Sequence, residues 1–121
     1  MAFILIVDDE FGMAEALRDL LRDEGYPAEA VFSGQQAMER MALERPLLVV
    51  TDYMMPAMDG PELLAAMRDH PSLADVPVVL MSSAPPHFWA QLPCAALLPK
   101  PFRLKPLLEV VRRLIGPPPG R

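Results

Sequence analysis

The sequence predicts an α/β domain built on a doubly wound sheet of five parallel strands, with helices on both faces. Two observations carry this prediction. Short apolar runs without polar interruption, such as residues 3–7 and 47–50, are typical of strands buried on both faces. These runs alternate along the chain with longer segments whose apolar residues recur at helical spacing, as expected for crossover helices between parallel strands.

Each apolar run defines a strand and each amphipathic segment a helix. We expect helices to begin at the cap-forming residues Ser33 and Asp59. Pro85, Pro86 and Pro93 leave little room for a helix between the last two strands, so this fourth helix, over 87–92, should be short or irregular. The expected strands are 2–7, 29–32, 47–51, 76–81 and 95–98, and the other expected helices are 10–24, 33–44, 59–69 and 104–115.

Length and composition restrict the function. With 121 residues and 52% hydrophobic content, the chain is expected to form one domain over residues 1–116, followed by a proline-rich tail over 117–121. The net charge of -5 argues against direct nucleic-acid binding. The apolar N-terminal run is too short to cross a bilayer, and the single Cys94 cannot form an internal disulfide. We therefore expect a cytoplasmic protein without a membrane partner.

Polar side chains gather where the predicted strands end. Asp8 and Asp9 follow the first strand, Asp52 the third, Ser82 the fourth and Lys100 the fifth. Because the carboxyl ends of parallel strands share one edge of a sheet, these side chains are expected to form one site. Clustered carboxylates need a cation, and hard oxygen ligands without His or Cys favour Mg²⁺, with Mn²⁺ as an alternative. The lysine and the serine suit the oxygens of a transferring phosphoryl group, which one carboxylate can accept as nucleophile.

Four motifs carry these residues, in order along nearly the whole chain. They are ILIVDDE at 4–10, TDYMMPAMDG at 51–60, PVVLMSSA at 77–84 and KPF at 100–102. Each motif alone is weak, whereas the four together are specific. At these motifs the chain closely resembles the receiver domain of bacterial two-component response regulators, and in particular the stand-alone chemotaxis regulators. The resemblance implies a flavodoxin-like strand order of 2-1-3-4-5.

The resemblance also implies a role for each acidic residue. Asp52 is expected to accept a phosphoryl group from the phosphohistidine of a sensor histidine kinase or of a phosphotransfer protein. Asp9 is expected to bind Mg²⁺ directly and Asp8 mainly through water. Asp52 and the backbone carbonyl of Met54 would complete the protein ligands of the metal.

Two further residues are expected to contact the phosphoryl group. Ser82 matches the switch residue that moves to hydrogen-bond it, and Lys100 matches the lysine that pairs with it. The Lys100–Pro101 bond is expected to be cis, as in the family. Phosphorylation would then shift a two-state equilibrium, with output through protein–protein contacts or phosphorelay to an unidentified downstream protein.

Three features depart from the family pattern. Leu97 stands near the position where members often carry an aromatic residue coupled to the switch hydroxyl. The segment 84–100 is shorter than in typical members and rich in proline, and Phe88-Trp89 within it either covers the core or contacts a partner. Neither Met54 nor Ala84 can position an attacking water by a strong hydrogen bond, so slow self-dephosphorylation is expected.

Other interpretations of these residues remain open. Asp8 and Asp9 could cap the first helix, and Ser82 could be an ordinary strand-end hydroxyl. One alternative function is a Mg-dependent phosphohydrolase of the aspartyl-phosphate type, although such enzymes usually place a second carboxylate where this chain has Met54. Another is a receiver-fold interaction module that is never phosphorylated. We favour a phosphorylation switch rather than an enzyme, either a stand-alone receiver or one excised from a longer protein.

Overall fold

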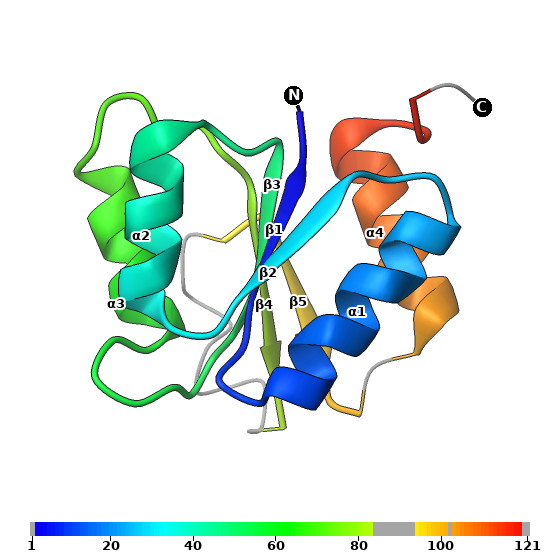
Figure 1. The fold of residues 1–121 in the computed structure, drawn as a ribbon, viewed down its shortest axis with the longest axis horizontal. Helices are drawn as coiled ribbons and strands as arrows, with labels where there is room; N and C mark the ends of the chain where they lie inside the picture. The colour runs from blue at the N-terminus through cyan, green and yellow to red at the C-terminus, as the bar shows by residue number, and fades with distance from the viewer. Residues whose placement is uncertain (1, 84–93, 102, 120–121) are drawn as a thin grey trace.

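Figure 1 shows the fold in a computed structural model, which describes residues 2–83, 94–101 and 103–119. Over these residues the chain forms five strands and four helices. The strands are β1 (Ile4–Val7), β2 (Ala28–Val31), β3 (Leu48–Asp52), β4 (Val78–Ser82) and β5 (Ala96–Pro99). The helices are α1 (Phe11–Asp23), α2 (Gly34–Leu43), α3 (Gly60–Arg68) and α4 (Leu104–Ile115).

All five strands run parallel in one sheet, in the order β2-β1-β3-β4-β5. This order confirms the predicted doubly wound, flavodoxin-like fold. The strand order reverses its direction at β1, where Val7 is paired with Val31 of β2 on one side and with Thr51 of β3 on the other. In open α/β sheets, the crevice beyond the carboxyl ends of the strands at such a reversal is where ligands bind.

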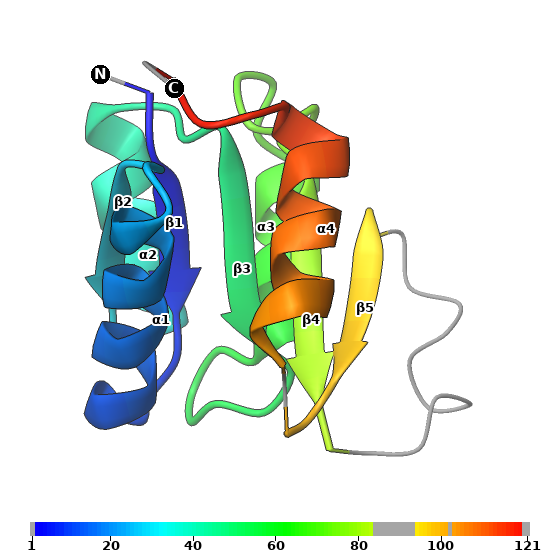
Figure 2. The same ribbon diagram turned by 90° about the vertical axis from the view of Figure 1, so that its right-hand side faces the viewer.

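Helices cover both faces of the sheet. Figures 1 and 2 show α2 and α3 on one face and α1 and α4 on the other. Side chains alternate along β1, so Leu5 and Val7 enter the core under α2 and α3, whereas Ile4 and Ile6 enter the core under α1 and α4. Every residue of β1, β3 and β4 is buried. Burial on both faces explains why these strands appear in the sequence as continuous apolar runs.

Two helices begin at the predicted caps. Asp59 accepts a hydrogen bond from the Glu62 amide at 2.8 Å, and the Glu62 carboxylate accepts one from the Asp59 amide at 3.0 Å, which completes a capping box at α3. At α2 the Ser33 hydroxyl accepts from the Gln36 amide at 3.0 Å. The Gln36 side chain accepts from the Phe32 amide rather than from that of Ser33, so this second box is shifted by one residue.

The observed elements begin and end within two residues of the predicted bounds. Strand β4 starts at Val78 rather than at residue 76, because Pro77 has no amide hydrogen to donate. Strand β3 extends one residue further than predicted and so includes Asp52. The predicted fourth helix over 87–92, together with Phe88-Trp89, lies outside the described residues, and Leu97 packs against the core under α2 and α3.

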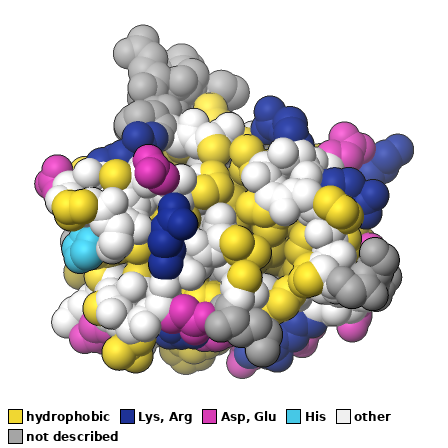
Figure 3. Space-filling model, turned by 90° about the horizontal axis from the view of Figure 1, so that it is seen from above, with side chains coloured by type: hydrophobic (Ala, Val, Ile, Leu, Met, Phe, Trp, Pro, Cys, Tyr) yellow, Lys and Arg dark blue, Asp and Glu magenta, His cyan; other side chains and the backbone are white. Residues whose placement is uncertain are grey.

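Both termini lie at the end of the sheet where the strands begin (Figure 1). There the Tyr26 hydroxyl donates a hydrogen bond to the Gly116 carbonyl at 2.7 Å, and Pro118 is buried, so the described part of the tail turns back onto the domain. Figure 3 views this end and shows hydrophobic side chains among charged ones. Within the described part of the chain, no helix combines the length and apolar character that a membrane span requires.

Candidate functional site

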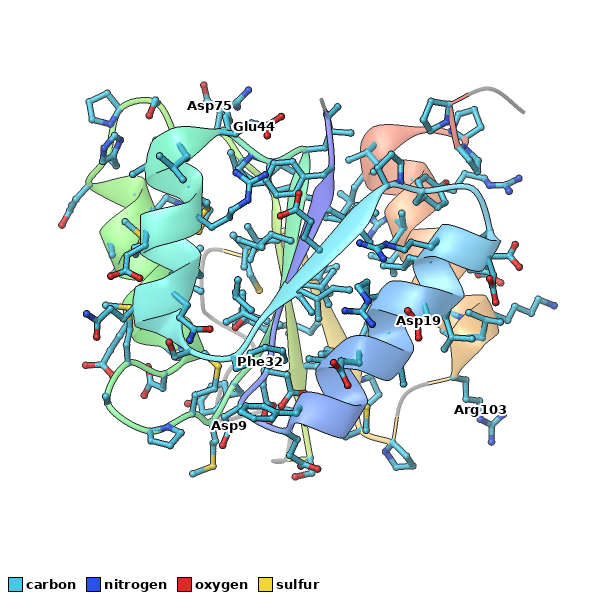
Figure 4. The ribbon with its side chains drawn as sticks, in the orientation of Figure 1. Asp9, Asp19, Phe32, Glu44, Asp75 and Arg103 are labelled. Atoms are coloured by element: carbon cyan, nitrogen blue, oxygen red, sulfur yellow. The ribbon has the colours of Figure 1, made fainter. Side chains whose placement is uncertain are left out.

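The structure brings the predicted site residues to one edge of the sheet. Asp8 and Asp9 directly follow β1, Asp52 ends β3, Ser82 ends β4, and Lys100 directly follows β5. Parallel strands present their carboxyl ends at the same edge, which is why residues far apart in the sequence meet here. Figure 4 shows Asp9 at this edge, opposite the end that carries Glu44 and Asp75.

Asp8 is the most deeply buried carboxylate of the site, with no exposed surface. Its Oδ1 accepts a hydrogen bond from the Glu10 amide at 3.0 Å, whereas its Oδ2 is buried without a hydrogen-bond partner. Burial raises the pKa of the Asp8 carboxyl above its ordinary value, and the charges of Asp52 and Asp9 act in the same direction. The Glu10 amide and the Lys100 ammonium lower that pKa without cancelling the rise.

Asp52 is paired with Lys100. The Lys100 ammonium lies 3.1 Å from Asp52 Oδ1 and 3.8 Å from Asp8 Oδ2. The same Oδ1 of Asp52 also accepts a hydrogen bond from the Tyr53 amide at 2.9 Å. Burial alone would lower the pKa of Lys100, but the hydrogen bond to Asp52 and the charges of Asp52, Asp8 and Glu10 outweigh it, so that pKa is raised. Lys100 is therefore a cation paired with the carboxylates of Asp52 and Asp8.

Backbone contacts fix the positions of Ser82 and Lys100. The Lys100 amide donates to the Ser82 carbonyl at 2.8 Å, and Ser82 is paired with Pro99 in the register of β4 and β5. The Lys100–Pro101 bond is cis, as predicted. The Ser82 residue is 3% exposed, so its hydroxyl lies inside the edge of the sheet rather than in a solvated loop.

Three carboxylates can share one cation. Ligand atoms of Asp8, Asp9 and Asp52 all lie within 4.8 Å of one another, with Asp8 and Asp52 buried and Asp9 exposed. The orphaned Asp8 Oδ2 is an independent sign that a charged group belongs here, because an unpartnered buried carboxylate oxygen is costly. An all-oxygen donor set suits Mg²⁺. The side chains of Asp8 and Asp9 do not cap α1, since its N-cap is Glu10 and no side-chain cap bond forms there.

The loop after Asp52 holds features that the sequence did not reveal. Position 60 requires glycine because its backbone lies close to that of Asp52. A Cβ at this position would be 2.6 Å from the Asp52 carbonyl oxygen. The Met54 side chain is 71% exposed, which leaves its backbone as the part able to serve the site. A cavity of about 410 Å³ adjoins the loop and is lined by Tyr53, Met54, Met55, Pro56 and Asp59. In the sequence, the Asp-Gly pair at 59–60 indicates a helix start and belongs to the family motif at 51–60, but it does not indicate this close approach.

Fold and site together define a flavodoxin-like α/β protein with an acidic, lysine-paired site at the carboxyl edge of its sheet. Residues 4–112 match the family model of the response regulator receiver domain. The chain therefore belongs to the receiver domains of response regulators, the proteins of two-component signalling systems.

Two relatives illustrate the match in sequence. The response regulator MprA of Mycolicibacterium vanbaalenii is 36% identical over 116 residues, which cover 93% of this chain and 49% of that protein. The MprA of Mycobacterium leprae is likewise 36% identical over 116 residues, covering 93% of this chain and 50% of that protein. The chain thus spans about half the length of these curated relatives.

Solved structures agree with the fold. The chemotaxis response regulator CheY4 of Vibrio cholerae superposes with a TM-score of 0.86 at 26% identity, covering 94% of this chain and 98% of that one. The signal receiver domain of a signal transduction histidine kinase from Syntrophus aciditrophicus superposes with a TM-score of 0.87 at 32% identity, covering 95% and 90% of the two chains.

Proposed function

We propose that Asp52 is the phospho-acceptor of this receiver domain. The observation that carries the proposal is the pairing of Asp52 with Lys100 at 3.1 Å, beside a buried carboxylate with an unpartnered oxygen. A nucleophilic carboxylate next to a fixed cation is the arrangement that phosphoryl transfer requires.

Asp8, Asp9, Asp52 and the backbone carbonyl of Met54 are the residues we assign to Mg²⁺. The exposed Asp9 would bind Mg²⁺ directly, and Asp8, whose Oδ2 has no hydrogen-bond partner, would act mainly through water. When bound, Mg²⁺ neutralises charge on the transferring phosphoryl group. Mn²⁺ has the same preference for oxygen ligands and can take its place.

Asp52, Lys100 and Ser82 each have a separate role in the proposed phosphoryl transfer. A carboxylate oxygen of Asp52 attacks the phosphorus of a phosphohistidine, the phosphorus–nitrogen bond breaks with its electron pair going to the imidazole, and an acyl phosphate forms on Asp52. Lys100 leaves its pairing with Asp52 and contacts the phosphoryl oxygens. The Ser82 hydroxyl, at the end of the neighbouring strand, donates a hydrogen bond to the same group and so conveys the modification to β4.

The donor we propose is a sensor histidine kinase or a phosphotransfer protein, which receiver domains contact. Output passes by protein–protein contact or phosphorelay to a downstream protein. The chain has a single cysteine, Cys94, and so no internal disulfide, which suits a reducing compartment, and we assign the protein to the cytoplasm.

Intact-mass spectrometry after incubation with acetyl phosphate and Mg²⁺ tests the acceptor. The wild type should gain one phosphoryl group, and Asp52→Ala should gain none. Asp75→Ala, which removes an exposed carboxylate at the opposite end of the molecule, should be labelled like the wild type (Figure 4). Labelling of Asp52→Ala at the wild-type rate would refute the assignment.

A phosphohydrolase is the enzymatic alternative, and the site favours it less. Such an enzyme needs a second carboxylate two residues after the nucleophile, where the exposed side chain of Met54 stands. We therefore assign a phospho-acceptor switch and no turnover of external phosphate esters. Multiple-turnover release of phosphate from an ester substrate would reverse this assignment.

A further inference from the structure

The loop between Asp52 and α3 contains a strained turn. The Met58 amide donates to the Pro56 carbonyl at 2.7 Å, and Ala57 between them has a φ of 65°. A hydrogen bond between residues two apart around a positive φ is a γ-turn of the rare, strained form. A non-glycine residue persists in this conformation only where the surrounding structure holds it there.

One support is the N-terminus of α2. A Cβ on Gly34 would lie 2.7 Å from Met58 Cγ, 2.8 Å from Met58 Sδ and 2.9 Å from Met58 Cβ. The side chain of Met58 therefore packs directly on the backbone of Gly34. Because the Cβ of Met58 moves only with its main chain, a methyl group on residue 34 would displace the loop itself and not just a flexible side chain.

The other support is at the base of the loop. The Gly60 amide donates to the Tyr53 carbonyl at 2.9 Å, and the capping box of Asp59 fixes the start of α3.

Apart from the Met58–Gly34 contact, the loop packs loosely on the start of α2, because a cavity of about 260 Å³ lies between them. This cavity is lined by Ser33, Gly34, Gln35, Pro56, Ala57 and Met58. Contact of Met58 with Gly34 is thus a close contact within an otherwise loosely packed interface.

We propose that the Met58–Gly34 contact holds the loop in the conformation that presents the Met54 backbone carbonyl to the cation site. Met58 is then a positioning residue for Mg²⁺, four residues away from the carbonyl it serves. The inference rests on the metal site assigned under the proposed function. Groups that orient metal ligands typically change metal affinity by about 10–100-fold when they are replaced.

Mg²⁺ titrations followed by amide NMR test this proposal on the intact chain. Gly34→Ala should weaken Mg²⁺ binding about tenfold. The matched control is Gly12→Ala on α1, where a Cβ would meet nothing within 4 Å and Mg²⁺ affinity should not change. Met58→Ala alone, which adds no clash and frees the loop, should also weaken binding.

The double variant Gly34→Ala/Met58→Ala gives a result that general destabilisation would not. Truncating Met58 removes the atoms that would lie at 2.7 and 2.8 Å from the new methyl group, so the double variant should bind Mg²⁺ more tightly than Gly34→Ala does. Equal Mg²⁺ affinity for wild type, Gly34→Ala and Met58→Ala would overturn the inference and leave the metal site intact. Absence of Mg²⁺ binding by the wild type would overturn both. If Gly34→Ala does not fold, an unchanged Mg²⁺ affinity of Met58→Ala is enough to refute the proposal.

Discussion

The Lys100 ammonium lies 3.8 Å from Asp8 Oδ2, the one buried side-chain oxygen without a hydrogen-bond partner in the described part of the chain. The same ammonium lies 3.1 Å from Asp52. One cation is therefore shared between two carboxylates that we also assign to Mg²⁺. In the proposed site, lysine and metal would compete electrostatically for these oxygens, although we assign both of them to phosphoryl transfer.

This competition predicts opposite effects of Lys100→Met on metal binding and on phosphorylation. Removing the ammonium leaves the acidic cluster more negative, so Mg²⁺ should bind more tightly. Phosphorylation by acetyl phosphate should slow by about 100-fold, because the charge that stabilises the transferring group is lost. Amide NMR and intact mass measure the two effects. Lys105→Met, an exposed lysine on α4, is the control for both, and weaker Mg²⁺ binding by Lys100→Met would contradict the shared-cation geometry.

Asp8→Asn should stabilise the fold and weaken Mg²⁺ binding about 10–100-fold. Burial raises the pKa of Asp8 from its ordinary value of 3.8, so the ionised carboxylate costs stability at neutral pH. The variant should gain on the order of 1 kcal/mol in the free energy of unfolding at neutral pH. That gain should shrink as the pH falls through the raised pKa, and vanish below the ordinary value, where the carboxyl is protonated in both states.

Urea denaturation across this pH range measures the effect of Asp8→Asn. Mg²⁺ binding to the folded state should also raise the free energy of unfolding of the wild type, and should raise that of the variant less at the same Mg²⁺ concentration. A variant less stable than the wild type at neutral pH would show that the buried carboxylate stabilises the fold rather than straining it.

Ala57→Gly should relieve the backbone strain of the γ-turn. The left-handed backbone conformation costs an L-residue about 1–2 kcal/mol, and replacing Ala57 with glycine removes this cost. The larger conformational entropy of glycine in the unfolded state offsets part of the resulting stabilisation. We expect the free energy of unfolding to rise by about 0.5–1 kcal/mol in urea denaturation. Ala65→Gly, at an exposed position of α3, should instead lower it by about 1 kcal/mol. An equal loss of unfolding free energy in Ala57→Gly and Ala65→Gly would exclude backbone strain at Ala57.

Phosphorylated wild type should lose its phosphoryl group slowly in Mg²⁺, with a half-life of minutes or longer. Met54 is exposed two residues after the proposed acceptor Asp52, and its thioether cannot position an attacking water by a strong hydrogen bond. Met54→Asn supplies an amide that can orient such a water, and should speed the loss severalfold in a time course of intact mass. A half-life of seconds for the wild-type phosphoprotein would show that another group orients the water.

Much of the fold could be predicted because its signals are local. Residues 48–50 are apolar throughout, since β3 is buried on both faces. The caps at Ser33 and Asp59 depend only on neighbouring residues and were also predictable. The grouping of Asp8, Asp52, Ser82 and Lys100 followed from one geometric rule, that parallel strands end at the same edge.

The remaining features depend on which segments meet in space. Nothing local distinguishes Asp8 from Asp9, yet one is fully buried with an unpartnered oxygen and the other is exposed. The contact of Met58 with Gly34 joins the loop before α3 to the first residue of α2, 24 positions away in the sequence, and neither residue carries a chemical signal of it. The sequence indicates Gly60 as a helix-start residue, whereas its close approach to the Asp52 carbonyl depends on how the chain folds.

The position of the two termini has a practical consequence. Tyr26 ties Gly116 to the end of the sheet where the strands begin, and the N-terminus lies at that same end (Figure 1). Asp9 and the proposed acceptor Asp52 follow or end strands at the opposite end, where Figure 4 labels Asp9. A fluorescent reporter or an affinity tag fused to either terminus should therefore leave the route to Asp52 unobstructed, so surface immobilisation through a tag would leave the proposed acceptor open to a phosphoryl donor.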